Sequence, residues 1–199
     1  MDTKEKAITD CINSFQQLLE TRYHIVLGRK GKTIHISISF EIEDCFHLMG
    51  LQKFKDKKEE RGKRKILMDI LNDVEYRRAF ASSPFYDNTI ADRISCATKL
   101  SRIIEADGTV FQFSKGRLPF WSAIDAQFLL SNSSIDGKQI YLFLANRSSN
   151  DDRLVCKSIF HKEKKDYTVN QTIWTVLLKE KTTGDITTII YRHKNYERT

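Results

Sequence analysis

His47 is the residue of this chain whose surroundings best suit acid–base chemistry. Alternating apolar residues end at Ile42, and Asp44 is a residue type that often caps a helix, so His47 is predicted to lie in the first helical turn. The positive end of the helix dipole would keep its imidazole neutral and fit to act as a general base. An ion pair with Asp44 would oppose this by raising the pKa of His47. The alternative is a structural histidine that caps its helix or binds a buried carbonyl.

Residues 156–181 form the second candidate region, because basic, aromatic and hydrogen-bonding side chains gather there. The pattern predicts a hairpin with a basic loop. RNA is bound through its phosphates and through bases stacked on aromatic rings, so this composition suits an RNA contact. An ordinary exposed hairpin with a solvated basic turn explains the same pattern, and both interpretations stay open. The side chains with suitable groups are Lys157, Ser158, His161, Tyr167, Gln171, Trp174 and Thr175.

The sequence contains no pattern typical of a metal site or a cofactor site. Its five histidines fall in no His-x-x-x-His arrangement, and its four cysteines lie far apart, without a Cys-x-x-Cys pair. We therefore expect no metal, no cofactor, and four reduced thiols that are mostly buried. These residues are His24, His35, His47, His161 and His193, and Cys11, Cys45, Cys96 and Cys156.

Composition and charge limit the function classes. The chain has 199 residues, 40% of them hydrophobic, and only two prolines, which predicts one globular domain with a substantial core. A net charge of +7 favours a polyanionic partner, either nucleic acid or an anionic membrane surface. The N-terminus contains no apolar signal segment, and the longest apolar run, residues 140–145, is too short to cross a bilayer. We therefore expect a soluble cytoplasmic protein without a membrane partner.

The elements that position these residues change in character near Gly108. Before Gly108, most apolar residues recur at helical spacing. The exception is residues 33–42, where every second residue is apolar, which predicts one strand. Residues 53–65 contain eight basic and three acidic residues and are predicted to be flexible. The predicted helices cover residues 3–24, 44–51, 66–81 and 90–106.

After Gly108, short runs of β-branched and aromatic residues predict strands. The runs cover residues 109–114, 122–132, 138–146, 153–161, 172–179 and 186–193. Helices followed by strands predict the α+β class, with N-terminal helices packed on a C-terminal twisted antiparallel β-sheet. Residues 1–199 would form a single domain, mainly helical over residues 1–107 and mainly antiparallel sheet over residues 108–193.

Two segments resemble a phage-associated branch of the barnase–EndoU–colicin–RelE-like (BECR) nucleases. One is residues 40–54, with Phe46-His47-Leu48-Met49-Gly50-Leu51; the other is residues 158–181, with Ser158-Ile159-Phe160, Tyr167, Gln171 and Trp174-Thr175-Val176-Leu177. In order and spacing the likeness spans roughly residues 10–192. It implies a nuclease domain with N-terminal helices, a twisted antiparallel sheet, and RNA cleavage without a metal.

The resemblance implies an endoribonuclease in which an RNA 2′-hydroxyl attacks its own adjacent phosphate. His47 would act as base or acid, and Tyr167 or His161 would donate the complementary proton or orient the phosphate. Positive charge for the transition state would come from Lys157 or Arg153. Other side chains would bind the substrate, namely Ser158, Gln171, Thr175, Lys53 and Lys55.

Three further functions fit the same sequence. The first is a non-catalytic module that binds RNA or protein on the same fold. The second is a phage- or mobile-element-associated toxin whose basic face meets an acidic antitoxin or immunity protein. The third is a structural component of a phage. The expected nucleic-acid partner is RNA, with tRNA as one candidate substrate.

Overall fold

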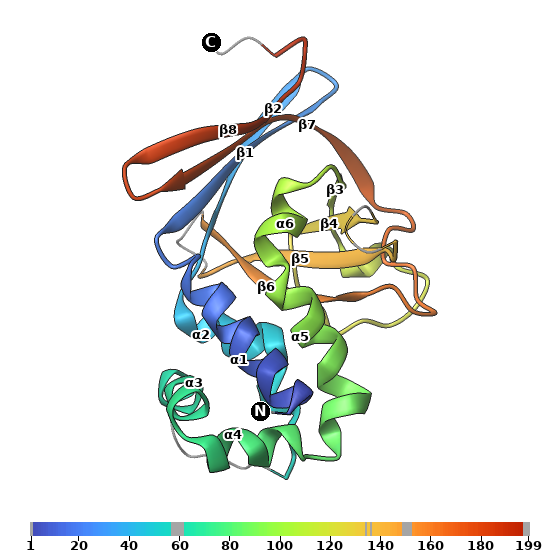
Figure 1. Ribbon diagram of the computed structural model, residues 1–199. Coiled ribbons are helices and arrows are strands. Elements are labelled where there is room, and N and C mark those ends of the chain that lie inside the picture. Colours follow the sequence, from blue (N-terminus) through green and yellow to red (C-terminus); the bar gives the residue numbers. More distant parts are fainter. Residues whose placement is uncertain (1, 57–61, 134, 136, 149–152, 197–199) are drawn as a thin grey trace.

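The computed structural model describes residues 2–56, 62–133, 135, 137–148 and 153–196. Helices gather at one end of the molecule, and a single strongly curved sheet occupies the other end (Figure 1). Part of the basic segment that was predicted to be flexible lies outside the described residues.

Of the eight strands that the described residues form, seven close into a ring. The strand order is β1-β2-β6-β5-β4-β3-β7, and β1 pairs with β7 to complete the ring, while β8 pairs with β7 outside it. All pairings are antiparallel except the one between β2 and β6. The strands are β1 (Thr21–Arg29), β2 (Lys32–Ser39), β3 (Thr109–Gln112), β4 (Phe128–Asn132), β5 (Ile140–Asn146), β6 (Arg153–His161), β7 (Thr172–Thr183) and β8 (Ile186–Arg192).

The predicted fold class, α+β with N-terminal helices packed on a C-terminal twisted antiparallel sheet, is wrong. The sheet is a closed seven-strand β-barrel with one extra strand, and two of its strands, β1 and β2, come from the N-terminal part of the chain. The error begins at the predicted helix over residues 3–24, because its apolar spacing continues past the true helix end at Gln16. Tyr23, Ile25 and Leu27 alternate as buried strand residues directly after it.

The described residues form six short α-helices, most of which gather at one end of this barrel (Figure 1). The predicted helix over residues 66–81 is divided at Asp73, whose carboxylate accepts the backbone N–H groups of Glu75 and Tyr76 and so caps a new helix. The helices are α1 (Thr3–Gln16), α2 (Ile42–Met49), α3 (Lys63–Asn72), α4 (Val74–Ala81), α5 (Ala91–Thr98) and α6 (Leu100–Glu105). Single turns add η1 (Leu51–Lys53), η2 (Tyr86–Ile90) and η3 (Lys115–Arg117).

The core has two parts. The larger cluster lies between the helices and the inner face of the barrel. The four cysteines are buried thiols that form no disulfide. The smaller cluster is aromatic and consists of Phe111, Phe113, Leu129, Tyr141 and Phe143, with Phe160 and Tyr167 packed against it. Helices α2 and α5 both contact β6, so this strand connects the helical end with the aromatic cluster. No helix among the described residues is long and apolar enough to cross a membrane.

The predicted hairpin over residues 156–181 is also wrong. Strand β6 pairs with β2 and β5, whereas β7 pairs with β1, β3 and β8, so the two strands are not neighbours. The basic residues between them therefore lie in a connection that crosses the barrel rather than in a tight turn. This connection passes over the aromatic cluster and forms one wall of a cleft.

Candidate functional site

A cleft of about 750 Å³ opens between α5, the end of β6 and the connection that follows β6. It brings together three residues predicted from sequence, namely Lys53, His161 and Tyr167. Its lining also includes Asp92, Arg93 and Trp121. Basic, acidic and aromatic groups thus share one concave surface, which is the usual form of a binding or catalytic site.

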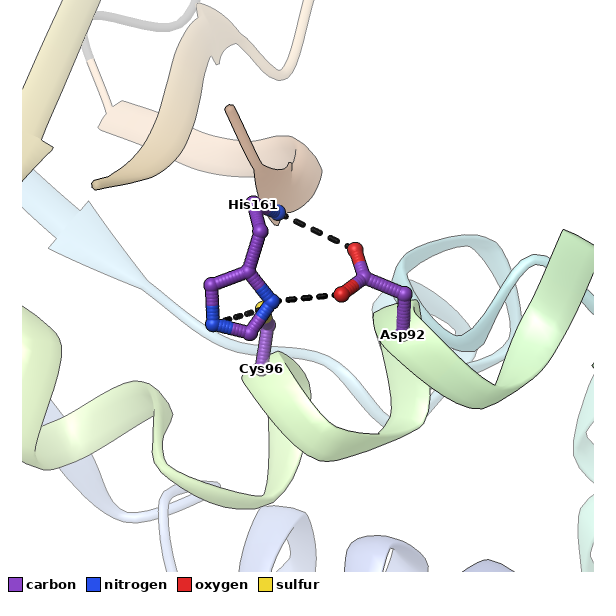
Figure 2. A group of neighbouring side chains, drawn as sticks. All are labelled: Asp92, Cys96 and His161. Carbon is purple, nitrogen blue, oxygen red and sulfur yellow. Dashed lines mark hydrogen bonds and ion pairs between the residues drawn. The ribbon is translucent and has the colours of Figure 1, made fainter. Parts of the chain in front are cut away.

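Asp92, Cys96 and His161 meet at the wall of this cleft (Figure 2). Asp92 and Cys96 are one turn apart on α5, and His161 is the last residue of β6. The Asp92 carboxylate receives the backbone N–H of His161 at 3.0 Å and lies 2.5 Å from its ring Nδ1. The Cys96 Sγ lies 3.4 Å from Nδ1 and 3.9 Å from Nε2.

The Asp92–His161 contact fixes both the position and the tautomer of the imidazole. When Nδ1–H donates to the carboxylate, the lone pair remains on Nε2, which is then the basic nitrogen. A carboxylate behind a histidine also stabilises the imidazolium that forms when Nε2 takes a proton. This pair can therefore act as an oriented general base or acid.

Two cations of the cleft have pKa values below their ordinary range. Burial lowers the pKa of the Arg93 guanidinium, which lies over the Phe160 ring at 5.6 Å from its centroid. Desolvation and the nearby Arg93 charge lower the pKa of the Lys53 ammonium. Positive charges placed close together are stabilised when an anion binds between them, so this arrangement suits a phosphate.

Aromatic rings form the other side of the cleft. Tyr167 makes edge contacts with Phe120, Phe143 and Phe160, with ring centroids 5.3 to 5.6 Å apart, so its phenol is held by the aromatic cluster. Trp121 is 80% exposed at the cleft lining. An exposed indole beside cationic groups provides a stacking surface for a nucleobase.

His47 lies outside the lining of the cleft, in a second cluster that also contains Lys63 and Lys157. Its helix starts at Ile42 with Glu41 as N-cap, so the predicted cap at Asp44 is wrong and His47 lies in the last turn. The Lys63 Nζ donates to His47 Nε2 at 2.7 Å. Burial lowers the pKa of His47, and the charges of Lys63 and Lys157 add to this effect.

The pKa of His47 is therefore shifted in the direction expected from the sequence, but for a different physical reason. The C-terminal end of a helix dipole favours a cation, so the dipole opposes this lowering of the pKa. The predicted partner Asp44 instead forms a paired contact with Arg147, at 2.8 and 3.3 Å. Since the Lys63 ammonium occupies the Nε2 lone pair of His47, this nitrogen is poorly placed to act as a base.

Lys157 lies at a β-bulge in β6. Cys156 pairs with Leu144 and Ser158 pairs with Phe143, which leaves Lys157 as the extra residue of β6. Its side chain is exposed, and its charge acts on His47. Lys157 and His161 thus place two basic positions along one strand.

Gln171 has a structural role in this fold. Its side-chain Oε1 accepts the backbone N–H of Ser114 at 2.8 Å, and its Nε2 donates to the carbonyls of Ser114 and Val169. These bonds fasten the connection after β6 to the loop after β3. The amide of Gln171 is therefore engaged in holding the cleft wall together.

The remaining predicted substrate-binding residues lie outside the lining of the cleft in the described part of the chain. Ser158 is buried, Thr175 is exposed on β7, and Arg153 starts β6 opposite Ser37. Lys55 is exposed just after η1. The structure thus separates these side chains from His161 and Tyr167.

Sequence reasoning missed Asp92, Arg93 and Trp121. Asp92 and Cys96 are spaced i and i+4 on a predicted helix, which is a usable signal for two polar groups on one face. The spacing of the apolar residues alone was enough to predict this helix, so its polar residues were not considered as a pair. Trp121 lies in a loop, for which periodicity gives no information.

A comparison with protein-family models matches residues 7–196 to a family described as phage-Barnase-EndoU-ColicinE5/D-RelE like nuclease4. This match covers nearly the whole chain and confirms the resemblance found from the sequence. No curated protein and no solved structure matches the chain significantly.

Proposed function

Because this chain belongs to the phage-Barnase-EndoU-ColicinE5/D-RelE like nuclease 4 family, we propose that it is a ribonuclease whose active site is the cleft at His161. The reaction is attack of an RNA 2′-hydroxyl on its adjacent phosphate. The observation that supports this site most strongly is the oriented Asp92–His161 pair beside two cations in a nuclease-family fold.

Each role follows from the chemistry of the side chain. His161 Nε2 removes the proton of the 2′-hydroxyl, and Asp92 stabilises the resulting imidazolium. Tyr167 lines the same cleft as a phenol that can protonate the leaving 5′-oxygen. Arg93 and Lys53 stabilise the negative charge that develops on the phosphate oxygens.

The His47 cluster binds a neighbouring part of the same RNA strand. Lys157 and His161 are four residues apart on β6, which corresponds to roughly 13 Å along an extended strand. Lys157 supplies positive charge at that distance, and Lys63 supplies it beside His47. Phosphate contacts of this kind position RNA without reading its sequence. His47 then keeps Lys63 in place rather than acting as the base.

Cleavage of total RNA and of purified tRNA in EDTA tests this proposal. His161→Ala is expected to lower the cleavage rate about 10²–10⁴-fold, because one acid–base group contributes about that much. His47→Ala is expected to weaken RNA binding while most of the rate at saturating RNA remains. His193→Ala, which alters a histidine outside the cleft lining, is the matched control.

The products and the folded state decide the interpretation. Products of the wild-type protein that end in 2′,3′-cyclic phosphate support the reaction, and urea unfolding verifies that each variant is folded. If His47→Ala loses the rate and His161→Ala keeps it, the base is His47 and the assigned site is wrong. RNA binding without any cleavage in these substrates would contradict the enzymatic proposal and favour a binding module.

A further inference from the structure

We propose that Asp92, Cys96 and His161 form an inhibitory binding site for a borderline-soft divalent cation, with Zn²⁺ as the representative ion. The regulatory part of this inference rests on the proposed role of His161 in cleavage. The donor atoms are a carboxylate oxygen, a thiol sulfur and an imidazole nitrogen, all within 4.8 Å of one another. Thiolate and imidazole are common ligands of zinc, whereas Mg²⁺ and Ca²⁺ prefer oxygen ligands.

The distances between the donor atoms are close to those of a loaded site. Zinc bonds of about 2.0–2.3 Å in tetrahedral geometry place the donors roughly 3.3–3.7 Å apart. The Cys96 Sγ already lies 3.4 Å from His161 Nδ1. The Asp92 oxygen, at 2.5 Å, has to move away by about 1 Å, and this carboxylate is 46% exposed and therefore has room to move.

Binding of the ion would disrupt the arrangement that cleavage needs. The Cys96 Sγ is near both ring nitrogens, so it lies against the ring rather than in line with one lone pair. The imidazole therefore has to turn before one ion can contact both groups, and this breaks the hydrogen bond from Nδ1 to Asp92. With the ion on Nδ1, the proton of the neutral imidazole is on Nε2, which then has no lone pair to accept the proton of a 2′-hydroxyl.

Charge and access agree with a divalent ion at this position. A thiolate and a carboxylate together carry two negative charges, which balance one divalent cation, and the neutral imidazole completes the set. Cys96 is buried, whereas Asp92 and His161 line the cleft, so the ion would enter from the cleft. The open side leaves one coordination position for water, as in sites with three protein ligands.

Metal binding is measured first, independently of cleavage. Competition between the protein and a chromophoric chelator gives the zinc affinity of the wild type, Cys96→Ala and Cys156→Ala. Cys156→Ala is the control, because Cys156 is a buried cysteine of β6 outside the Asp92–Cys96–His161 cluster. Loss of Cys96 is expected to weaken zinc binding by about 10–100-fold or more, while Cys156→Ala binds like the wild type. With Co²⁺ in place of Zn²⁺, a thiolate-to-cobalt charge-transfer band should appear only when Cys96 is present.

Cleavage is then measured with and without Zn²⁺. Saturating zinc is expected to lower the wild-type rate by up to about 10²–10⁴-fold, the contribution of the base, while Cys96→Ala keeps its rate when zinc is added. Equal zinc affinity in the wild type and Cys96→Ala, or activation of cleavage by zinc, would overturn the proposal. If the protein does not cleave RNA in EDTA, the proposed function fails, and the affinity and cobalt data alone decide whether the metal site exists.

Discussion

At the scale of single residues, the surroundings of each histidine decide its chemistry more than its place in the sequence does. His161 has a carboxylate behind its ring in an open cleft, whereas His47 has an ammonium on its lone pair. The carboxylate of the first arrangement fixes which ring nitrogen carries the proton, and the ammonium of the second disfavours protonation of the ring. Two histidines with the same intrinsic pKa therefore suit different roles.

The lowered pKa of His47 predicts how stability depends on pH. In the unfolded chain His47 titrates near 6.5, and in the folded chain burial and the charges of Lys63 and Lys157 lower its pKa. Below pH 6.5 the unfolded chain therefore binds a proton that the folded chain does not, and the folded state loses stability as the pH falls. We expect the free energy of unfolding to decrease less between pH 7 and pH 5 in His47→Gln than in the wild type.

Urea unfolding at both pH values measures this difference, with His193→Gln as the control. His193→Gln measures how much of any difference comes from replacing a histidine with glutamine as such. An equal loss in His47→Gln and in the wild type would contradict the assigned cause.

At the scale of elements, the end of α2 lies against the side chain of Arg93, a cleft residue. Gly50 ends this helix in the left-handed conformation with φ of 79°. A Cβ atom at this position would lie 2.9 Å from the Arg93 Cδ atom. The helix end therefore needs glycine for two reasons, its backbone conformation and the close approach of a cleft residue.

Gly50→Ala is therefore expected to reduce both stability and cleavage. The left-handed conformation alone costs a non-glycine residue about 1–2 kcal/mol, and displacement of Arg93 adds to this cost. Gly31→Ala is the matched control, because Gly31 has φ of 76° and no atom within 4 Å of its Cβ position. Urea unfolding and the RNA cleavage assay should show that Gly31→Ala loses only stability. Unchanged cleavage in Gly50→Ala would show that the position of Arg93 does not matter.

At the scale of the whole molecule, closure of the barrel by β1 and β7 makes β8 an addition rather than a closing strand. Most residues of β8 are exposed, whereas Ile25 in β1 is fully buried. We therefore expect β1 to contribute more than β8 to the free energy of unfolding.

Truncation after Gly184, which removes β8, is expected to leave a protein that unfolds cooperatively and cleaves RNA. Ile25→Ala should cost about 2–5 kcal/mol, as large-to-small changes in a core usually do, and the truncation should cost less. Urea unfolding of both proteins gives the comparison. A truncated chain without a cooperative transition would show that β8 is part of the essential fold.

The sequence alone predicted much of the local structure and the correct family. Strict alternation gave the strand that is β2, and runs of β-branched residues gave strands that correspond to β3 through β8. His161, Tyr167 and Lys53 were selected as candidate site residues because of their side-chain chemistry, and all three line the cleft. Such features depend on the residue itself or on neighbours close in the chain, so a local pattern can reveal them.

Only the tertiary structure decided how these parts meet. The start of strand β1 was predicted as helix, because the helical spacing of apolar residues continued into it. Its pairing with β7 joins segments that are far apart in the chain. Asp92 and His161 are 69 positions apart, and no periodicity relates them. The strand ring and the Asp92–His161 pair both arise from contacts that form when the core packs, and for this reason the sequence predicted the elements and the family but not the barrel or the site.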